Sequence, residues 1–240
     1  MSDLMVDIVL VPAGFEHLIV SASIGLTLSP SPVVLSIPMG PVASANYLRK
    51  MIESGSFFKP ASNILLIGLA GGLSPDLRPG DKVLIEECAS YHQFDQLSVR
   101  WLSCDHSLVN SLIQILPAVK SGRLITTNSV FCESKDKLNL WRQSGADVVD
   151  MEGFIALKLL SESGHHVSIL RVISDDSHHD LPDIESVVSA SGSLALLPLV
   201  LSFLKRPRVS IRFISASLTG LCSLFVLAAQ LFGSKPSRAA

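Results

Sequence analysis

The chain has 240 residues and a formal net charge of −2, a length that suits one α/β domain but not two. Hydrophobic residues make up 48% and charged residues only 17%, so a large core can be buried, and no basic run in residues 1–204 argues for binding nucleic acid. The four cysteines are scattered without a CxxC pair, and the first residues carry acids but no basic region. These features argue against a disulfide framework, a zinc site and a secretory signal, and they predict a cytoplasmic protein.

Short apolar runs that end at glycine or proline alternate with segments whose apolar residues are three or four positions apart. The first pattern is typical of buried strands and the second of helices. In chain order, we predict strands at Met5–Ala13 and Val33–Ile37, a helix at Val42–Ser54, strands at Asn63–Ala70 and Lys82–Glu87, a helix at Leu108–Leu116, strands at Leu124–Thr127 and Asp147–Asp150, a helix at Met151–Ser161, a strand at Val167–Ile173 and a helix at Ser186–Leu204. The alternation predicts a single α/β domain over residues 1–205, with a central mixed, mostly parallel sheet flanked by helices.

Residues 206–240 are predicted to form a C-terminal apolar helical extension. The stretch Phe213–Ser234 has no charged residue and is long enough to cross a bilayer, which needs about 20 apolar residues. Polar residues dilute this signal, so a helix packed on the domain and a helix lying on a membrane surface stay open beside a transmembrane helix. Basic residues flank the stretch: Arg206, Arg208 and Arg212 before it, and Lys235 and Arg238 after it.

Four of the predicted strands end in residues that could carry chemistry. They lead to Glu16, to Gly68–Gly72, to Asp150–Glu152 and to Arg171–Asp175. In open α/β sheets ligands bind beyond the carboxyl ends of strands, so carboxylates and one arginine would converge on one crevice. Each residue also has a structural explanation: Asp175 as a helix N-cap, Glu152 as an acid favoured by a helix dipole, and Glu16 as a solvated loop acid.

Other chemical motifs are missing from the sequence. There is no GxGxxG dinucleotide fingerprint and no GxxxxGK[ST] phosphate loop. The pairs His165-His166 and His178-His179 lack the HExxH or i,i+4 spacing of metal ligands. We therefore expect neither a metal nor a cofactor.

Three ordered motifs resemble those of a known family. Leu69–Leu73 followed by Leu77–Asp81 resembles the AGGL…GD segment of methylthioadenosine/S-adenosylhomocysteine nucleosidases and their nucleoside phosphorylase relatives. Val149–Gly153 resembles their acidic Met-Glu segment, and Arg171–Asp175 resembles their RxISD segment. The similarity in order and spacing runs from about Val6 to Leu204, and it implies cleavage of the N-glycosidic bond of a purine nucleoside.

The resemblance also implies roles for individual residues. Asp175 matches the general acid that protonates the purine at N7, Glu16 falls where the nucleosidases place the acid that activates water, and Arg171 assists. Glu152 matches the carboxylate that holds the ribose hydroxyls. The remaining substrate-binding residues are Met151 beside the sugar, Phe131 stacking on the base, and Ala70, Gly71 and Gly72 along the pocket. General acid catalysis typically raises a rate by about 10²–10⁴-fold. Asp175 should be protonated in order to act as the acid, whereas Glu152 should stay ionised in order to stabilise the sugar hydroxyls and positive charge.

The nucleophile and the substrate stay open at this point. The strand before Gly71 has no basic residue, and none of the arginines precedes Tyr47, which disfavours a phosphate site and favours water as nucleophile. The apolar tail is similar to that of the hopanoid-associated phosphorylase group, which implies an adenosylated lipid substrate and peripheral membrane contact as an alternative. A further alternative is a nucleoside-binding protein without turnover. The resemblance also implies a homo-oligomer, commonly a dimer, and a role in nucleoside catabolism or methionine salvage.

Overall fold

In the computed structural model, residues 6–26, 31–55, 58–91, 100–182 and 207–233 are described. The strands are β1 (Ile8–Pro12), β2 (Val33–Ile37), β3 (Asn63–Gly72), β4 (Lys82–Ser90), β5 (Leu102–Ser103), β6 (Lys120–Thr126), β7 (Val148–Asp150) and β8 (His166–Asp175). The helices are α1 (Phe15–Gly25), α2 (Pro41–Ser54), α3 (His106–Ile115), α4 (Ser134–Ser144), α5 (Gly153–Glu162) and α7 (Pro207–Phe232).

The described strands form one mixed sheet in the order β2-β1-β3-β7-β6-β4-β5, and β8 pairs with both β3 and β4. Most pairings are parallel, while β3 with β7, β4 with β5 and β4 with β8 are antiparallel. Five strands form a closed ring of pairings, in the order β3–β7–β6–β4–β8 and back to β3. This closure brings the end of β7 next to β8, so that residues about 20 positions apart in the chain come into contact.

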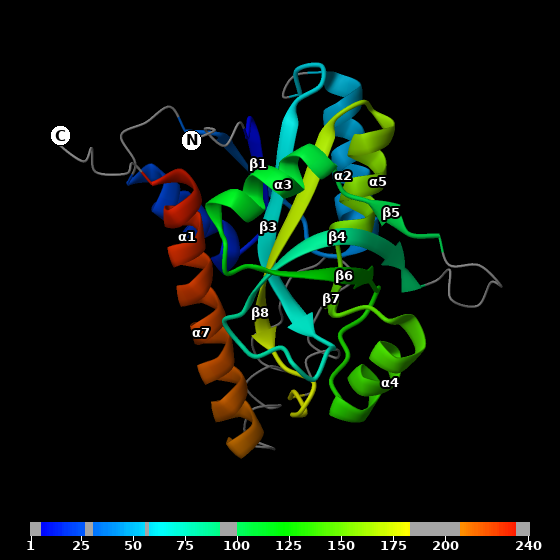
Figure 1. Cartoon of the computed structure of the whole chain (residues 1–240), viewed down its shortest axis with the longest axis vertical. Coiled ribbons are helices and arrows are strands. Elements are labelled where there is room, and N and C mark those ends of the chain that lie inside the picture. Colours follow the sequence, from blue (N-terminus) through cyan, green and yellow to red (C-terminus); the bar gives the residue numbers. More distant parts are fainter. Residues whose placement is uncertain (1–5, 27–30, 56–57, 92–99, 183–206, 234–240) are drawn as a thin grey trace.

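The apolar runs of the sequence supply the core of the sheet. In β1 all five residues are buried, and β3 and β8 are buried over most of their length, as expected for strands covered on both faces. Helices α1 and α7 lie together on one side of the sheet, and α2 and α5 pack against each other on another (Figure 1). The predicted fold class is therefore confirmed.

Three elements were not predicted from the sequence: α1, α4 and the short strand β5. The other predicted strands and helices are present with ends that differ by at most four residues, except the helix at Ser186–Leu204, which lies outside the described residues. The segment after β1 was interpreted as a loop, whereas Glu16 lies in the first turn of α1. Asp175 is the last residue of β8 and not a helix N-cap.

The C-terminal extension folds onto the domain as helix α7. Its inner face is buried against α1, β8 and β3 through Leu224, Leu227, Ala228 and Leu231, and the Ser23 hydroxyl of α1 donates to the Phe225 carbonyl at 3.0 Å. By length and composition, Val209–Phe232 could cross a membrane, with a mean hydropathy of 1.8 and 22% of its most apolar window buried. The domain boundary at residues 205 and 206 stays a prediction.

Candidate active site

Arg171 lies at the centre of a buried cluster of carboxylates. It is on β8, is fully buried, and its Nη2 donates to Oδ2 of Asp150 in a close ion pair. The same nitrogen is 4.0 Å from Oε2 of Glu152. Asp150 is fixed in turn by the Thr126 hydroxyl at 2.7 Å and by the backbone N–H of Gly153 at 2.9 Å. Since a buried arginine is stable only when it is paired, the acids of the sequence motifs are what hold it there.

Glu16 joins this cluster from the first turn of α1. Its Oε2 accepts a hydrogen bond of 2.6 Å from the backbone N–H of Leu69. The absence of a side chain at Gly68 makes room for it: a Cβ there would lie 2.5 Å from Glu16 Oε2 and 2.7 Å from Arg171 Nη1. The glycine of the β3 motif is therefore needed for the approach of a carboxylate and a guanidinium to the strand.

Glu152 reaches the cluster from the position just before α5. Its Oε1 accepts a 2.8 Å hydrogen bond from the backbone N–H of Gly40, at the start of α2. Met151 lies beside the same glycine, with its Cε 4.0 Å from the place that a Cβ of Gly40 would occupy. The Met-Glu pair thus faces the N-terminus of α2, where backbone N–H groups point outward.

Three carboxylates share one arginine in this cluster, and the pKa values of Glu16 and Glu152 are raised. Burial raises the pKa of Glu16 to about 8, opposed by the Leu69 N–H and by Arg171. Burial, together with the negative charge of Asp150, raises the pKa of Glu152 to about 7. The sequence predicts an ionised Glu152, whereas burial and the charge of Asp150 bring its pKa close to neutral pH although Arg171 lies nearby.

Asp175 belongs to a second group on the same strands. Its Oδ2 forms a close ion pair with the Lys137 ammonium of α4, and its Oδ1 accepts a 2.6 Å hydrogen bond from the Ser174 hydroxyl. The predicted general acid thus has an ammonium group as its direct neighbour, and its role stays a prediction. Gly71 leaves room here as well, since a Cβ at that position would lie 3.2 Å from Asp175 Oδ2.

The strand β3 connects the two groups. Gly68 contacts the Glu16 cluster and Gly71 contacts Asp175, three residues along a strand that rises about 3.3 Å per residue. The pairing of β3 with β8 shifts register between Ala70 and Gly71, so Gly71 lies opposite Asp175 and one residue of β8 is left over. Ala70 is buried and its carbonyl lies 3.2 Å from the Ser174 hydroxyl, whose one proton goes to Asp175, while Gly72 packs under the Asp175 carbonyl. The two glycines are therefore about 10 Å apart along the strand.

Phe131 is half-buried at the edge of a separate apolar cluster. It packs near Val149 and Leu140, and its ring meets Tyr91 edge-on with centroids 5.9 Å apart. Its stacking on a base stays a prediction.

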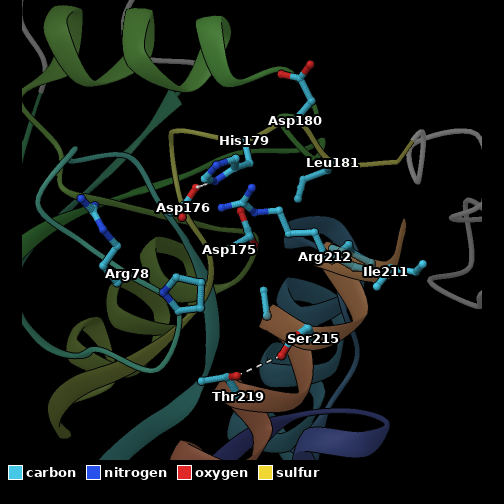
Figure 2. Close-up of a pocket in the computed structure, with 13 residues that line it drawn as sticks. Arg78, Asp175, Asp176, His179, Asp180, Leu181, Ile211, Arg212, Ser215 and Thr219 are labelled. Carbon is cyan, nitrogen blue, oxygen red and sulfur yellow. Dashed lines mark hydrogen bonds and ion pairs between the residues drawn. The ribbon is translucent and has the colours of Figure 1, made fainter. Parts of the chain in front are cut away.

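A pocket of about 690 Å³ opens on the far side of Asp175. Asp175, Asp176 and His179 line it from the segment after β8, and Arg212 and Thr219 line it from α7. Figure 2 shows the Arg212 side chain extending from α7 towards Asp175. The C-terminal helix therefore forms one wall of the pocket that contains the predicted general acid.

Sequence analysis assigned no role to two residues that the structure places in the site. Asp150 belongs to the strand end Asp150–Glu152 that the sequence points to, but its pairing with Arg171 is not evident there. Lys137 gave no signal, because a lysine in a polar helix is ordinarily solvated. Among the described residues, no group of three His, Cys, Asp or Glu side chains could hold a metal ion.

Comparison with known proteins identifies the family of this chain. The family model described as "Phosphorylase superfamily" matches residues 11–197. The chain belongs to the phosphorylase superfamily. A DeoD-type purine nucleoside phosphorylase from Exiguobacterium sibiricum is 25% identical over 150 residues. This match covers 58% of the chain and 60% of the relative, so the chain matches less than two thirds of that relative's length.

Solved structures show the superfamily fold over nearly the whole chain. A methylthioadenosine/S-adenosylhomocysteine nucleosidase of Helicobacter pylori is 20% identical with a TM-score of 0.61, covering 95% of this chain and 99% of that one. The futalosine hydrolase of the same organism is 18% identical with a TM-score of 0.63 and the same coverage. A Neisseria meningitidis nucleosidase in complex with methylthio-immucillin-A is 14% identical with a TM-score of 0.66, covering 93% and 97%.

Proposed function

We propose that this protein cleaves the N-glycosidic bond of a purine nucleoside of the adenine type, with water as the nucleophile. The observation that carries the proposal is the cluster at Gly68, where Glu16 and Glu152 approach a buried arginine that is already paired with Asp150. Its membership of the phosphorylase superfamily supports this reaction. The likeness to methylthioadenosine/S-adenosylhomocysteine nucleosidases and to futalosine hydrolase names the substrates to test, and a role in methionine salvage depends on the first of them.

Each acid has a distinct task in this reaction. Breaking the C–N bond leaves positive charge on the sugar and negative charge on the base, so Asp175 donates a proton to the departing purine. Glu152 binds the ribose hydroxyls and, when ionised, stabilises the positive charge. Glu16 removes a proton from water, and its pKa of about 8 makes it a stronger base than an ordinary carboxylate.

The position of Arg171 supports water over phosphate. Its side chain is fully buried and its charge is used by Asp150, so it is not available as a clamp for a phosphate dianion. Glu16 would also repel a phosphate placed at the same point when it is ionised.

The reaction can be tested with purified protein in phosphate-free buffer. Incubation with methylthioadenosine, S-adenosylhomocysteine, futalosine and adenosine should release free purine from at least one substrate, and added phosphate should not raise the rate. Strict dependence on phosphate, with a sugar 1-phosphate product, would replace hydrolysis by phosphorolysis. Tight binding without release would indicate a nucleoside-binding protein.

The outer face of α7 favours a second candidate, the cleavage of a lipid-linked adenosyl substrate at a membrane. Ile211 is 69% exposed and lines the Asp175 pocket. It is the first residue of a row of exposed apolar side chains along one face of α7. The row consists of Ile211, Ile214, Leu218, Phe225 and Val226. With its inner face packed on the domain, α7 would lie in the bilayer surface and not cross it.

Vesicle flotation tests this membrane contact. The protein should float with phosphatidylcholine vesicles that contain phosphatidylglycerol, and the double variant Ile214→Glu, Leu218→Glu should stay at the bottom of the gradient. The control Ile113→Glu, at a 40% exposed position of α3, should float like the wild type. We also propose that the protein is a homodimer. If the wild type never floats, and sedimentation shows that the double variant no longer forms dimers, then a second copy of the chain covers this face of α7.

A further inference from the structure

Lys137 is a buried lysine whose position the packing of α4 does not explain. Its side chain is 1% exposed, although α4 is a polar helix in which only one other residue, Leu140, is buried. Taking an ammonium out of water costs several kcal/mol unless it finds charged or polar partners. The partners of Lys137 are Oδ2 of Asp175 and the Asp176 carbonyl, the latter at 3.1 Å. Both lie at the end of β8, so α4 delivers one positive charge to the predicted general acid.

The Asp175 carboxylate is held at both oxygens. Lys137 binds Oδ2, the Ser174 hydroxyl binds Oδ1, and Gly71 leaves the space into which the carboxylate projects. Other charged groups surround this point: Asp176 is paired with His179, and Arg78 and Arg212 line the pocket from β3–β4 and from α7. Of the cations among these described residues, Lys137 is the one that makes an ion pair with Asp175.

We propose that Lys137 is a positioning residue for proton donation by Asp175. This inference rests on the proposed N-glycosidic cleavage. In that reaction the C–N bond breaks with its electron pair going to the purine, and the proton of the Asp175 carboxyl moves to the purine nitrogen. The carboxylate that remains is stabilised by the Lys137 ammonium and the Ser174 hydroxyl. Water supplies a hydroxyl to the sugar carbon and a proton to Glu16. Exchange with solvent then removes that proton from Glu16 and returns one to Asp175.

A pair of substrates separates this role from a merely structural one. A purine needs a proton to leave, whereas p-nitrophenolate leaves from p-nitrophenyl β-D-ribofuranoside without one. Lys137→Met should lower kcat for the purine nucleoside by about 10²-fold, the lower end of the usual range for general acid catalysis, with KM changed little. With the nitrophenyl riboside, the kcat of the Lys137→Met variant should differ from that of the wild type by less than about threefold, because no proton has to be donated to that leaving group.

Matched variants complete the test. Lys137→Arg keeps the charge and should restore most of the rate on the purine nucleoside, while Lys135→Met, on the same helix but 72% exposed, should behave as the wild type. The double variant Lys137→Met, Asp175→Asn should be no slower than Asp175→Asn alone, because both changes remove one function.

The outcomes that overturn the proposal are distinct from those that overturn the function. Equal loss on both substrates by Lys137→Met, or a normal rate on the purine nucleoside, rules out positioning of the acid by Lys137. Failure of the wild type to release purine from any nucleoside refutes the proposed function and the inference with it.

Discussion

Replacing Asp175 by Asn should lower kcat for purine release by about 10²–10⁴-fold and leave the fold intact. An amide cannot give up a proton to the departing base, but it can keep the hydrogen bond from the Ser174 hydroxyl at Oδ1. Loss of the negative charge leaves the Lys137 ammonium without its ion-pair partner, so some loss of stability accompanies the loss of rate. Steady-state release of purine, followed by absorbance or chromatography, measures the effect.

The control for this experiment is Asp76→Asn, an exposed acid in the loop after β3. It should change neither the rate nor the melting temperature beyond experimental error. A near-normal rate for Asp175→Asn would remove Asp175 from the mechanism. A lower rate explained by unfolding would be recognised by circular dichroism and by a melting temperature well below that of the wild type.

The fold could be predicted where apolar patterning is strong. The strands β1, β3 and β8 are nearly continuous apolar runs. Such runs are typical of central strands, which are covered on both faces of the sheet. The helix α4 could not be found in this way, because its sequence is mostly polar and its burial depends on Lys137 and Leu140 alone. The first helix, α1, follows β1 after only two residues, and its apolar residues are spread around it.

The candidate site was predictable as a set of strand ends but not as a set of interactions. The motifs correctly placed Glu16, Glu152 and Arg171 together, since β1, β7 and β8 all reach β3. That Arg171 pairs with Asp150 and not primarily with Glu152 depends on distances of a few ångströms that no motif encodes. The raised pKa values of Glu16 and Glu152 follow chiefly from their burial, which the sequence does not show either.

Glu16→Gln should lower activity and raise stability at alkaline pH, and the two effects have one cause. Burial raises the pKa of Glu16 in the folded protein to about 8, above its ordinary value of 4.5. The folded state therefore holds this proton more tightly than the unfolded state does. The stabilisation that results is fully present below pH 4.5, declines above it, and is lost as the pH rises through 8. The buried Glu152, with a pKa of about 7, causes a similar decline below pH 7 in both proteins. Glutamine at position 16 stays neutral, so the variant should lack the alkaline decline above pH 7 that the wild type shows.

The activity of the wild type should show the opposite trend over the same range. A general base must be ionised, so kcat/KM should rise with pH until about 8 on the Glu16 limb. Glu16→Gln should lose about 10²–10⁴-fold in kcat and lose this limb, while glutamine Oε1 can still accept the hydrogen bond from Leu69. Denaturant unfolding and initial rates, both measured across pH 5–9, test the two effects together. If the variant keeps the alkaline decline in stability, or the wild type shows no rise in rate towards pH 8, the carboxyl beside Gly68 is not the buried base that this site requires.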